Sequence, residues 1–246
     1  MLTSNLISGK ITEDLKKRLL ANYVKSDSNV FTLYVSANGD DTTGDGTQER
    51  PFQTVKRACQ ETASINAYNR IDIEPLTDIT EGGFALPSLK KIRFNTSQKH
   101  TITFTQNVGL TSCISIEFYK CVFEGGIDLT FGSVVNFNNC TFDGDNSYGV
   151  CLRVRYNSSA SLFYTNTIKS TSDKSVIGVS AYCDSYILLS GDQINLDGAF
   201  TSFIRIDDNS AIGIGASTKI NSLGNLSGTQ YVLLDACILN IKSRGG

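Results

Sequence analysis

Arginine and aspartate side chains immediately precede or follow evenly spaced apolar residues in the second half of the chain. They are Arg153, Arg155, Arg205, Asp207 and Asp235, with Asp184 and Asp208 close by. Two carboxyl groups about 5 to 9.5 Å apart can cleave a glycosidic bond, one as acid and the other as base or nucleophile. A fold that stacks Asp207 on Asp235 would make them candidates for such a pair. The alternative, which we favour, is that these charges are solvated or form salt bridges between subunits.

Three tyrosines accompany these charges. Tyr156, Tyr182 and Tyr186 carry rings that could stack on sugars, but such rings also pack well at protein interfaces. At these positions we favour an interface, because the chain has no tryptophan, a frequent partner of sugars.

Composition excludes several other chemistries. The 246 residues include one histidine, His100, so a multi-histidine metal site cannot form and a catalytic triad has one possible base. The net charge of −2 gives no indication of a nucleic-acid or membrane partner. Seven cysteines without a C-x-x-C pair are typical of small core residues made in a reducing compartment. We therefore expect no cofactor and no metal.

A loop rich in glycine and aspartate could still suggest calcium. Asp41, Thr43 and Asp45 resemble the start of a calcium loop, but its twelfth position, which should be a bidentate glutamate, is Phe52. A solvated turn is the better interpretation, with glycines adopting positive φ.

The elements that would position these residues change along the chain. Residues 11–24 have the apolar spacing of an amphipathic helix, which could pack on its own domain or serve for oligomerisation or docking. Residues 52–65 predict a second helix, which begins after Pro51. All three prolines precede residue 88, and beyond it short apolar pairs with period-two spacing indicate short strands.

The strand anchors are evenly spaced. Leu110, Leu129, Val154, Val179, Ile206 and Leu234 follow one another at intervals of 19 to 28 residues. A unit of this length cannot bury its own apolar face and must stack on its neighbours. We predict a right-handed parallel β-helix of about seven coils, with the anchors as one inward column and serine or asparagine turns that satisfy one another between coils.

The segment before the repeats carries a resemblance. Tyr34 to Asp41, then Gly44 to Thr47, then Pro51 to Cys59 resembles the lead-in of pectate-lyase-like β-helix proteins, especially bacteriophage tailspikes and tail fibres. The resemblance implies a first strand, a loop and a helix that caps the open end of the solenoid. It divides the chain into an N-terminal helical attachment segment (1–30), a lead-in with capping helix (31–70) and the β-helix (71–246).

What the resemblance implies for function is a virion part. Phage members are usually homotrimers that attach to the tail or baseplate through their N-terminal segment, which would here be residues 1–30. Their enzymes cleave surface polysaccharides with paired carboxylates, or with an arginine base beside acids. Known depolymerases are mostly longer, with a separate C-terminal trimerisation domain, and this chain ends soon after the last coil. We therefore expect a non-catalytic, trimeric tail subunit that could contact host polysaccharide, with a polysaccharide hydrolase or lyase as the alternative.

Overall fold

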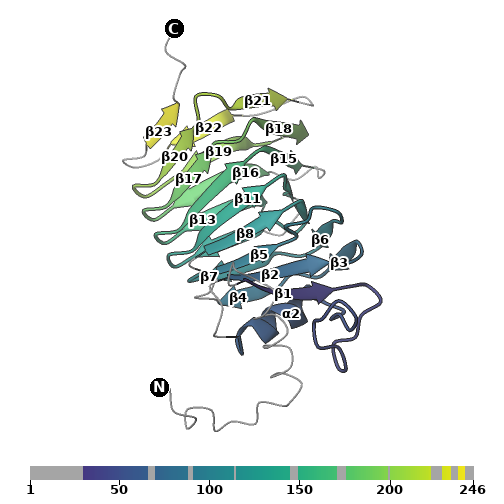
Figure 1. The fold of residues 1–246 in the computed structure, drawn as a ribbon. Helices are drawn as coiled ribbons and strands as arrows, with labels where there is room; N and C mark the ends of the chain where they lie inside the picture. Colours follow the sequence, from purple (N-terminus) through teal and green to yellow (C-terminus); the bar gives the residue numbers. More distant parts are fainter. Residues whose placement is uncertain are drawn as a thin grey trace.

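The computed structural model shows a stack of short strands wound into a solenoid (Figure 1). It describes residues 30–65, 70–87, 91–113, 115–144, 149–170, 176–198, 200–222, 229–233 and 238–241. Their strands form three sheets in which all neighbours are parallel and come from successive turns. The chain is therefore a parallel β-helix, as the sequence predicts, whereas its handedness stays a prediction.

Each turn contributes one strand to each sheet. Sheet A contains β1 (Val30–Val35), β2 (Arg70–Pro75), β5 (Lys91–Phe94), β8 (Ser115–Tyr119), β11 (Val134–Asn138), β14 (Ser159–Phe163), β17 (Tyr186–Leu189), β20 (Ala211–Ile214) and β23 (Ile238–Ile241). Sheet B contains β3 (Ile79–Glu81), β6 (Ile102–Phe104), β9 (Cys121–Phe123), β12 (Thr141–Asp143), β15 (Thr165–Ser170), β18 (Gln193–Gly198) and β21 (Lys219–Ser222). Sheet C contains β4 (Ala85–Pro87), β7 (Val108–Thr111), β10 (Ile127–Thr130), β13 (Val150–Arg155), β16 (Ile177–Tyr182), β19 (Ser202–Ile206) and β22 (Thr229–Leu233).

The predicted number of coils is too high for the regular part of the solenoid. The regular part of the solenoid has about five turns rather than seven. The strands at either end extend the sheets, but Ile220 of β21 is 40% exposed although it lies in an inward row. Incomplete end turns are expected of a solenoid, because the last turn has a neighbour on one side only.

The predicted inward column is correct in part. The inward column observed in sheet C is Leu86, Leu110, Leu129, Val154, Ala181 and Ile206. Val179 instead pairs with Leu152, two residues from its predicted place. The reason for this error is that Val179 and Ala181 both face inward, and a shift of two residues keeps the same face inward, so alternation of apolar residues cannot distinguish them. The predicted anchor Leu234 lies outside the described residues.

Stacked phenylalanines fill the interior of the middle turns. Phe94, Phe118 and Phe137 of sheet A stack at 4.6 and 5.6 Å between ring centroids. Phe123 of sheet B meets Phe118 edge-on at 5.1 Å. All four rings are fully buried, and Phe123 contacts the sheet A row inside the solenoid.

Serines hold the corner between sheets C and A. Ser133, Ser158, Ser185 and Ser210 are buried, and each hydroxyl accepts a hydrogen bond from the backbone N–H of the turn before it, at 3.0 to 3.2 Å. This confirms the prediction that polar turns satisfy one another from coil to coil.

The predicted second helix is present but shorter than expected. Helix α2 (Val55–Thr62) lies at the β1 end of the stack (Figure 1), with Thr54 as its N-cap. The Glu81 carboxylate accepts hydrogen bonds from the N–H groups of Val55 and Lys56 at 2.7 and 2.9 Å. Burial raises the pKa of the Glu81 carboxyl, and these hydrogen bonds oppose that rise. The helix predicted over 11–24 lies outside the described residues.

The aspartates of the preceding loop serve as acceptors for the chain itself. The Asp41 carboxylate accepts bonds from the N–H groups of Gln53 and Thr54 and from the Thr54 hydroxyl, at 2.6 to 2.9 Å. Asp40 and Asp45 accept bonds from nearby backbone N–H groups in the same way. The loop is thereby fastened to the start of α2, where carboxylates are favoured.

Candidate functional site

The predicted arginines do share the outer face of sheet C. Arg153 and Arg205 lie two strands apart in one outward row, with Ser180 between them. Arg155 lies two residues after Arg153 on the same face of β13 and is aligned with Tyr182. Asp235 lies outside the described residues, so the predicted Asp207–Asp235 pair stays a prediction.

Sequence reasoning missed the acid at the centre of this face. The Asp128 carboxylate of β10 lies 2.7 Å from the Nη2 atoms of both Arg153 and Arg155 and accepts a third bond from Arg155 Nε at 3.2 Å. Burial would lower the pKa of Arg155, but its bonds to Asp128 outweigh this effect and raise it. The signal was available, because Asp128 precedes Leu129 as Arg153 precedes Val154.

The remaining charged candidates are further along the stack. Asp207 lies 3.5 Å from Arg205 Nη2, and the Arg205 guanidinium lies 5.6 Å from the Tyr182 ring centroid. Asp184 and Asp208 are exposed at the corner that leads into sheet A. In outward rows of sheet C, Asp128 and Arg205 are three strands apart, so Asp207 and Asp128 are too distant to act as a carboxylate pair.

The three predicted tyrosines lie around the corner between sheets C and A, in two successive turns. Tyr156 is at the C–A corner, where its ring stacks on Phe131 at 5.0 Å and lies beside Arg155. Tyr182 ends β16, whereas Tyr186 begins β17 on sheet A. All three therefore flank the same C–A corner, and their predicted role, in sugar stacking or in an interface, stays a prediction.

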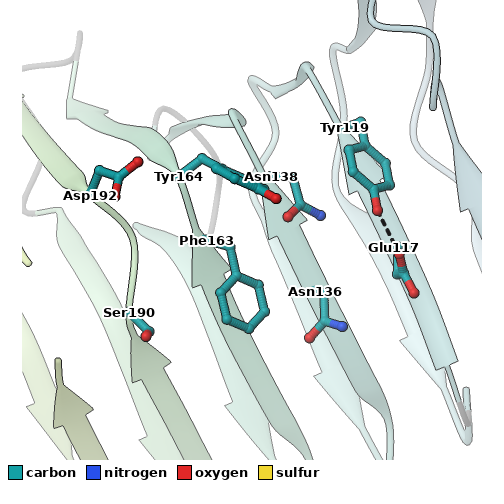
Figure 2. A pocket seen from close by; sticks show the side chains of 8 residues that line it. All are labelled: Glu117, Tyr119, Asn136, Asn138, Phe163, Tyr164, Ser190 and Asp192. Atoms are coloured by element: carbon teal, nitrogen blue, oxygen red, sulfur yellow. Dashed lines mark hydrogen bonds between the residues drawn. The ribbon is translucent and has the colours of Figure 1, made fainter.

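A groove of about 350 Å³ lies on the outer face of sheet A in the described part of the chain and is a second candidate site (Figure 2). It crosses β8, β11, β14 and the end of β17 and is lined by Glu117, Tyr119, Asn136, Asn138, Phe163, Tyr164, Ser190 and Asp192. All eight were missed by the sequence analysis, which used the strands of sheet A only to find inward residues.

Register brings these side chains together. Asn136 pairs with Glu117, and Asn138 lies between Tyr119 and Phe163. Their side chains point outward because they alternate with the buried residues of the same strands. Tyr119, Asn138 and Phe163 thus form one continuous row of aromatic and amide groups across the neighbouring strands β8, β11 and β14.

At one end of the groove, Arg93 and Tyr119 hold the Glu117 side chain in place. Arg93 of β5 contacts the Glu117 carboxylate through Nε at 2.9 Å and Nη2 at 3.3 Å. Tyr119 donates its hydroxyl proton to Glu117 Oε2 at 2.7 Å. Burial, followed by this hydrogen bond and the charge of Glu117, raises the pKa of Tyr119 to about 12.

The other end depends on a close backbone approach. A Cβ atom on Gly191 would lie 2.0 Å from the carbonyl oxygen of Tyr164, so only glycine fits at this corner. The turn after β17 therefore lies against the turn after β14. This contact places the exposed Asp192 carboxylate at the rim, close to Tyr164 (Figure 2).

Comparison of the chain with protein-family models, with curated proteins and with solved structures finds no match in any of the three. The site is therefore interpreted from its own residues. Among the residues that the structure describes, no three His, Cys, Asp or Glu side chains are grouped to hold a metal ion. That part of the chain also has no helix with both the length and the apolar character of a membrane span.

The groove has the composition of a binding site rather than a hydrolytic one. Glu117 and Asp192 come from turns three strand spacings apart, which corresponds to about 14 Å at about 4.8 Å per strand. This separation exceeds the roughly 5 to 9.5 Å that glycoside hydrolysis requires. Glu117 is in addition occupied by Arg93 and Tyr119. Aromatic rings beside amides are, by contrast, suited to polyhydroxylated ligands.

The hydrogen bond from Tyr119 makes a measurable prediction. The raised pKa means that the folded state favours the protonated phenol, so its stabilising contribution is present below pH 10 and is lost as pH rises toward 12. The tyrosinate absorbance of the wild type minus that of Tyr119→Phe should titrate near pH 12. A difference that titrates near pH 10 would contradict the Tyr119–Glu117 contact.

Proposed function

We propose that this protein is a non-catalytic bacteriophage tail fibre or tailspike subunit that binds host surface polysaccharide through the groove on sheet A. The observation that carries the proposal is the row of aromatic and amide side chains along a rigid parallel β-helix, without a carboxylate pair at catalytic distance in that groove. The lead-in with α2 at one end of the stack supports the tail-protein class. The virion location and attachment through residues 1–30 belong to the same proposal.

A homotrimer is part of this proposal. Four apolar side chains are strongly exposed at or beside the C–A corner: Phe131, Val134, Tyr156 and Tyr186. Such a cluster along one edge is suited to lateral contact between copies of the chain. Sedimentation equilibrium should return three times the chain mass of 26.7 kDa. A stable monomer at micromolar concentration would contradict the trimer.

The binding proposal is tested by removing an aromatic ring from the groove. Phe163→Ala should weaken binding to purified capsular or O-antigen polysaccharide at least about tenfold, because truncation of a central aromatic typically costs more than about 1.4 kcal/mol. Phe163→Tyr should retain most of the affinity. Val122→Ala, which shortens an outward side chain of sheet B, should leave it unchanged. Equal binding by the wild type and Phe163→Ala would overturn the groove as the binding site.

The alternative function, a polysaccharide hydrolase or lyase, is favoured by one observation. Asp207 lies beside Arg205 and Tyr182 on sheet C, where an acid and an arginine could act on a glycan. Reducing ends and unsaturated uronates should be measured after incubation with the same polysaccharides. We expect no release. Release that Asp207→Asn abolishes would establish the enzyme and overturn our preference.

A further inference from the structure

Two asparagine side chains line the groove on sheet A from the same strand, β11, which lies between the aromatic residues of β8 and β14 (Figure 2). Asn136 and Asn138 are two residues apart, so both face outward and are about 6.6 Å apart along the strand. Asn138 is only 5% exposed and donates one Nδ2 hydrogen to the carbonyl of Phe118 at 3.3 Å. Its second Nδ2 hydrogen can donate to a ligand and its Oδ1 can accept from one, as can the amide of Asn136.

Charge around these asparagines is either balanced or distant. On one side, Arg93 compensates the Glu117 carboxylate at 2.9 Å. On the other side, the half-buried ring of Phe163 lies next to Asn138 in the register of the sheet. Asp192 follows β17, two strands away from β11, and carries its charge at the rim. The middle of the groove therefore presents neutral amides beside an aromatic ring.

We propose that this groove recognises sugars that carry acetamido groups. The inference rests on the proposed function and names the ligand class of the same site. An acetamido group is a trans secondary amide, so its N–H and its carbonyl point in opposite directions and need two separate partners. Asn136 and Asn138 can supply these partners, because one amide can accept from the N–H while the other donates to the carbonyl. The acetyl methyl group then contacts the Phe163 ring, a contact that a bare hydroxyl or ammonium group does not offer.

Three trisaccharides test this preference by calorimetric titration. The probes are the trimers of N-acetylglucosamine, glucosamine and glucose, which share a ring and differ in the group on its second carbon. The N-acetylglucosamine trimer should bind at least about tenfold more tightly than the other two, because each of them lacks the two amide hydrogen bonds and the methyl contact. Acetyl-trialanine amide, which supplies secondary amides without sugar rings, should bind more weakly than the N-acetylglucosamine trimer.

Asn136 provides the variant that separates this preference from glycan binding in general. Asn136→Ala should bring the three trimers to within about threefold of one another, since one of the two amide partners is missing. Asn195→Ala makes the same change on the outer face of sheet B, outside the groove, and should preserve the tenfold difference.

Four results would each overturn the acetamido preference. They are equal affinity for the three trimers, an unchanged preference in Asn136→Ala, no binding of any trimer, and tighter binding of the acetylated peptide than of the N-acetylglucosamine trimer. The polysaccharide assay with Phe163→Ala decides separately whether the groove binds glycans at all.

Discussion

Replacing Phe118 with alanine is expected to lower the free energy of unfolding by about 3 to 5 kcal/mol. The Phe118 ring is fully buried between Phe94 and Phe137 in the sheet A row and meets Phe123 of sheet B edge-on. Its removal opens a cavity that neighbouring turns cannot fill, because their strands are fixed by the sheet hydrogen bonds on either side. Since domains typically have only about 5 to 15 kcal/mol of stability, this is a large share. Denaturant unfolding followed by far-UV circular dichroism gives the value.

Phe163→Ala is the matched control for this experiment. It makes the same chemical change on the same sheet, but the Phe163 ring lies on the outer face and is only half-buried. We expect it to cost about 1 kcal/mol or less. Equal losses in the two variants would show that the phenylalanine rows do not form the core. The control also shows whether Phe163→Ala is folded when its polysaccharide binding is measured.

The solenoid could be predicted from the sequence because its signal is repeated. Short pairs such as Ile116 and Phe118 mark strands with one face inward, and their spacing marks turns that must stack. The register was predicted correctly for Leu110, Leu129, Val154 and Ile206 but not for Val179. In β10 every residue from Ile127 to Thr130 is buried, and in β16 Ser180 is as buried as Val179. Burial of both faces weakens this alternation, and alternation also cannot distinguish two inward residues of one strand, such as Val179 and Ala181.

The groove on sheet A was harder to predict than the fold. Glu117, Asn136 and Phe163 alternate with inward residues, so their outward direction follows from the pattern. A groove, however, depends on differences in side-chain size and on the close passage of Gly191 against Tyr164, neither of which has a sequence period. For the arginine face, which is Arg153, Arg155 and Arg205 on the outside of sheet C, the outcome was the opposite. Spacing identified these arginines. Their acidic partner Asp128 was missed because the alignment of turns was not extended from β13 to the preceding strand β10.

The position of Asp128 suggests what the arginine face does. Three hydrogen bonds join Asp128 to Arg153 and Arg155, and the Asp128 side chain is only 12% exposed. A carboxylate held in this way offsets one of the two positive charges and reduces the repulsion between two guanidinium groups that lie on one strand. The geometry is that of a clamp between successive turns, which supports a structural role for these arginines.

Replacing Asp128 with alanine should therefore destabilise the protein by about 2 to 3 kcal/mol. Breaking a buried ion pair typically costs about 3 to 5 kcal/mol, and the one-third exposure of the Arg155 side chain lowers the expected value. Asp128→Asn should fall between alanine and the wild type, because the amide oxygen can still accept. Asp207→Ala on the same face removes a contact of 3.5 Å to a more exposed arginine and should cost about 0 to 1 kcal/mol.

In a double-mutant cycle, Arg155→Ala should cost much less in the absence of Asp128 than in its presence, since its partner is already missing. A loss below about 0.5 kcal/mol in Asp128→Ala would mean that the arginines do not depend on this carboxylate, and would return them to the candidates for glycan chemistry.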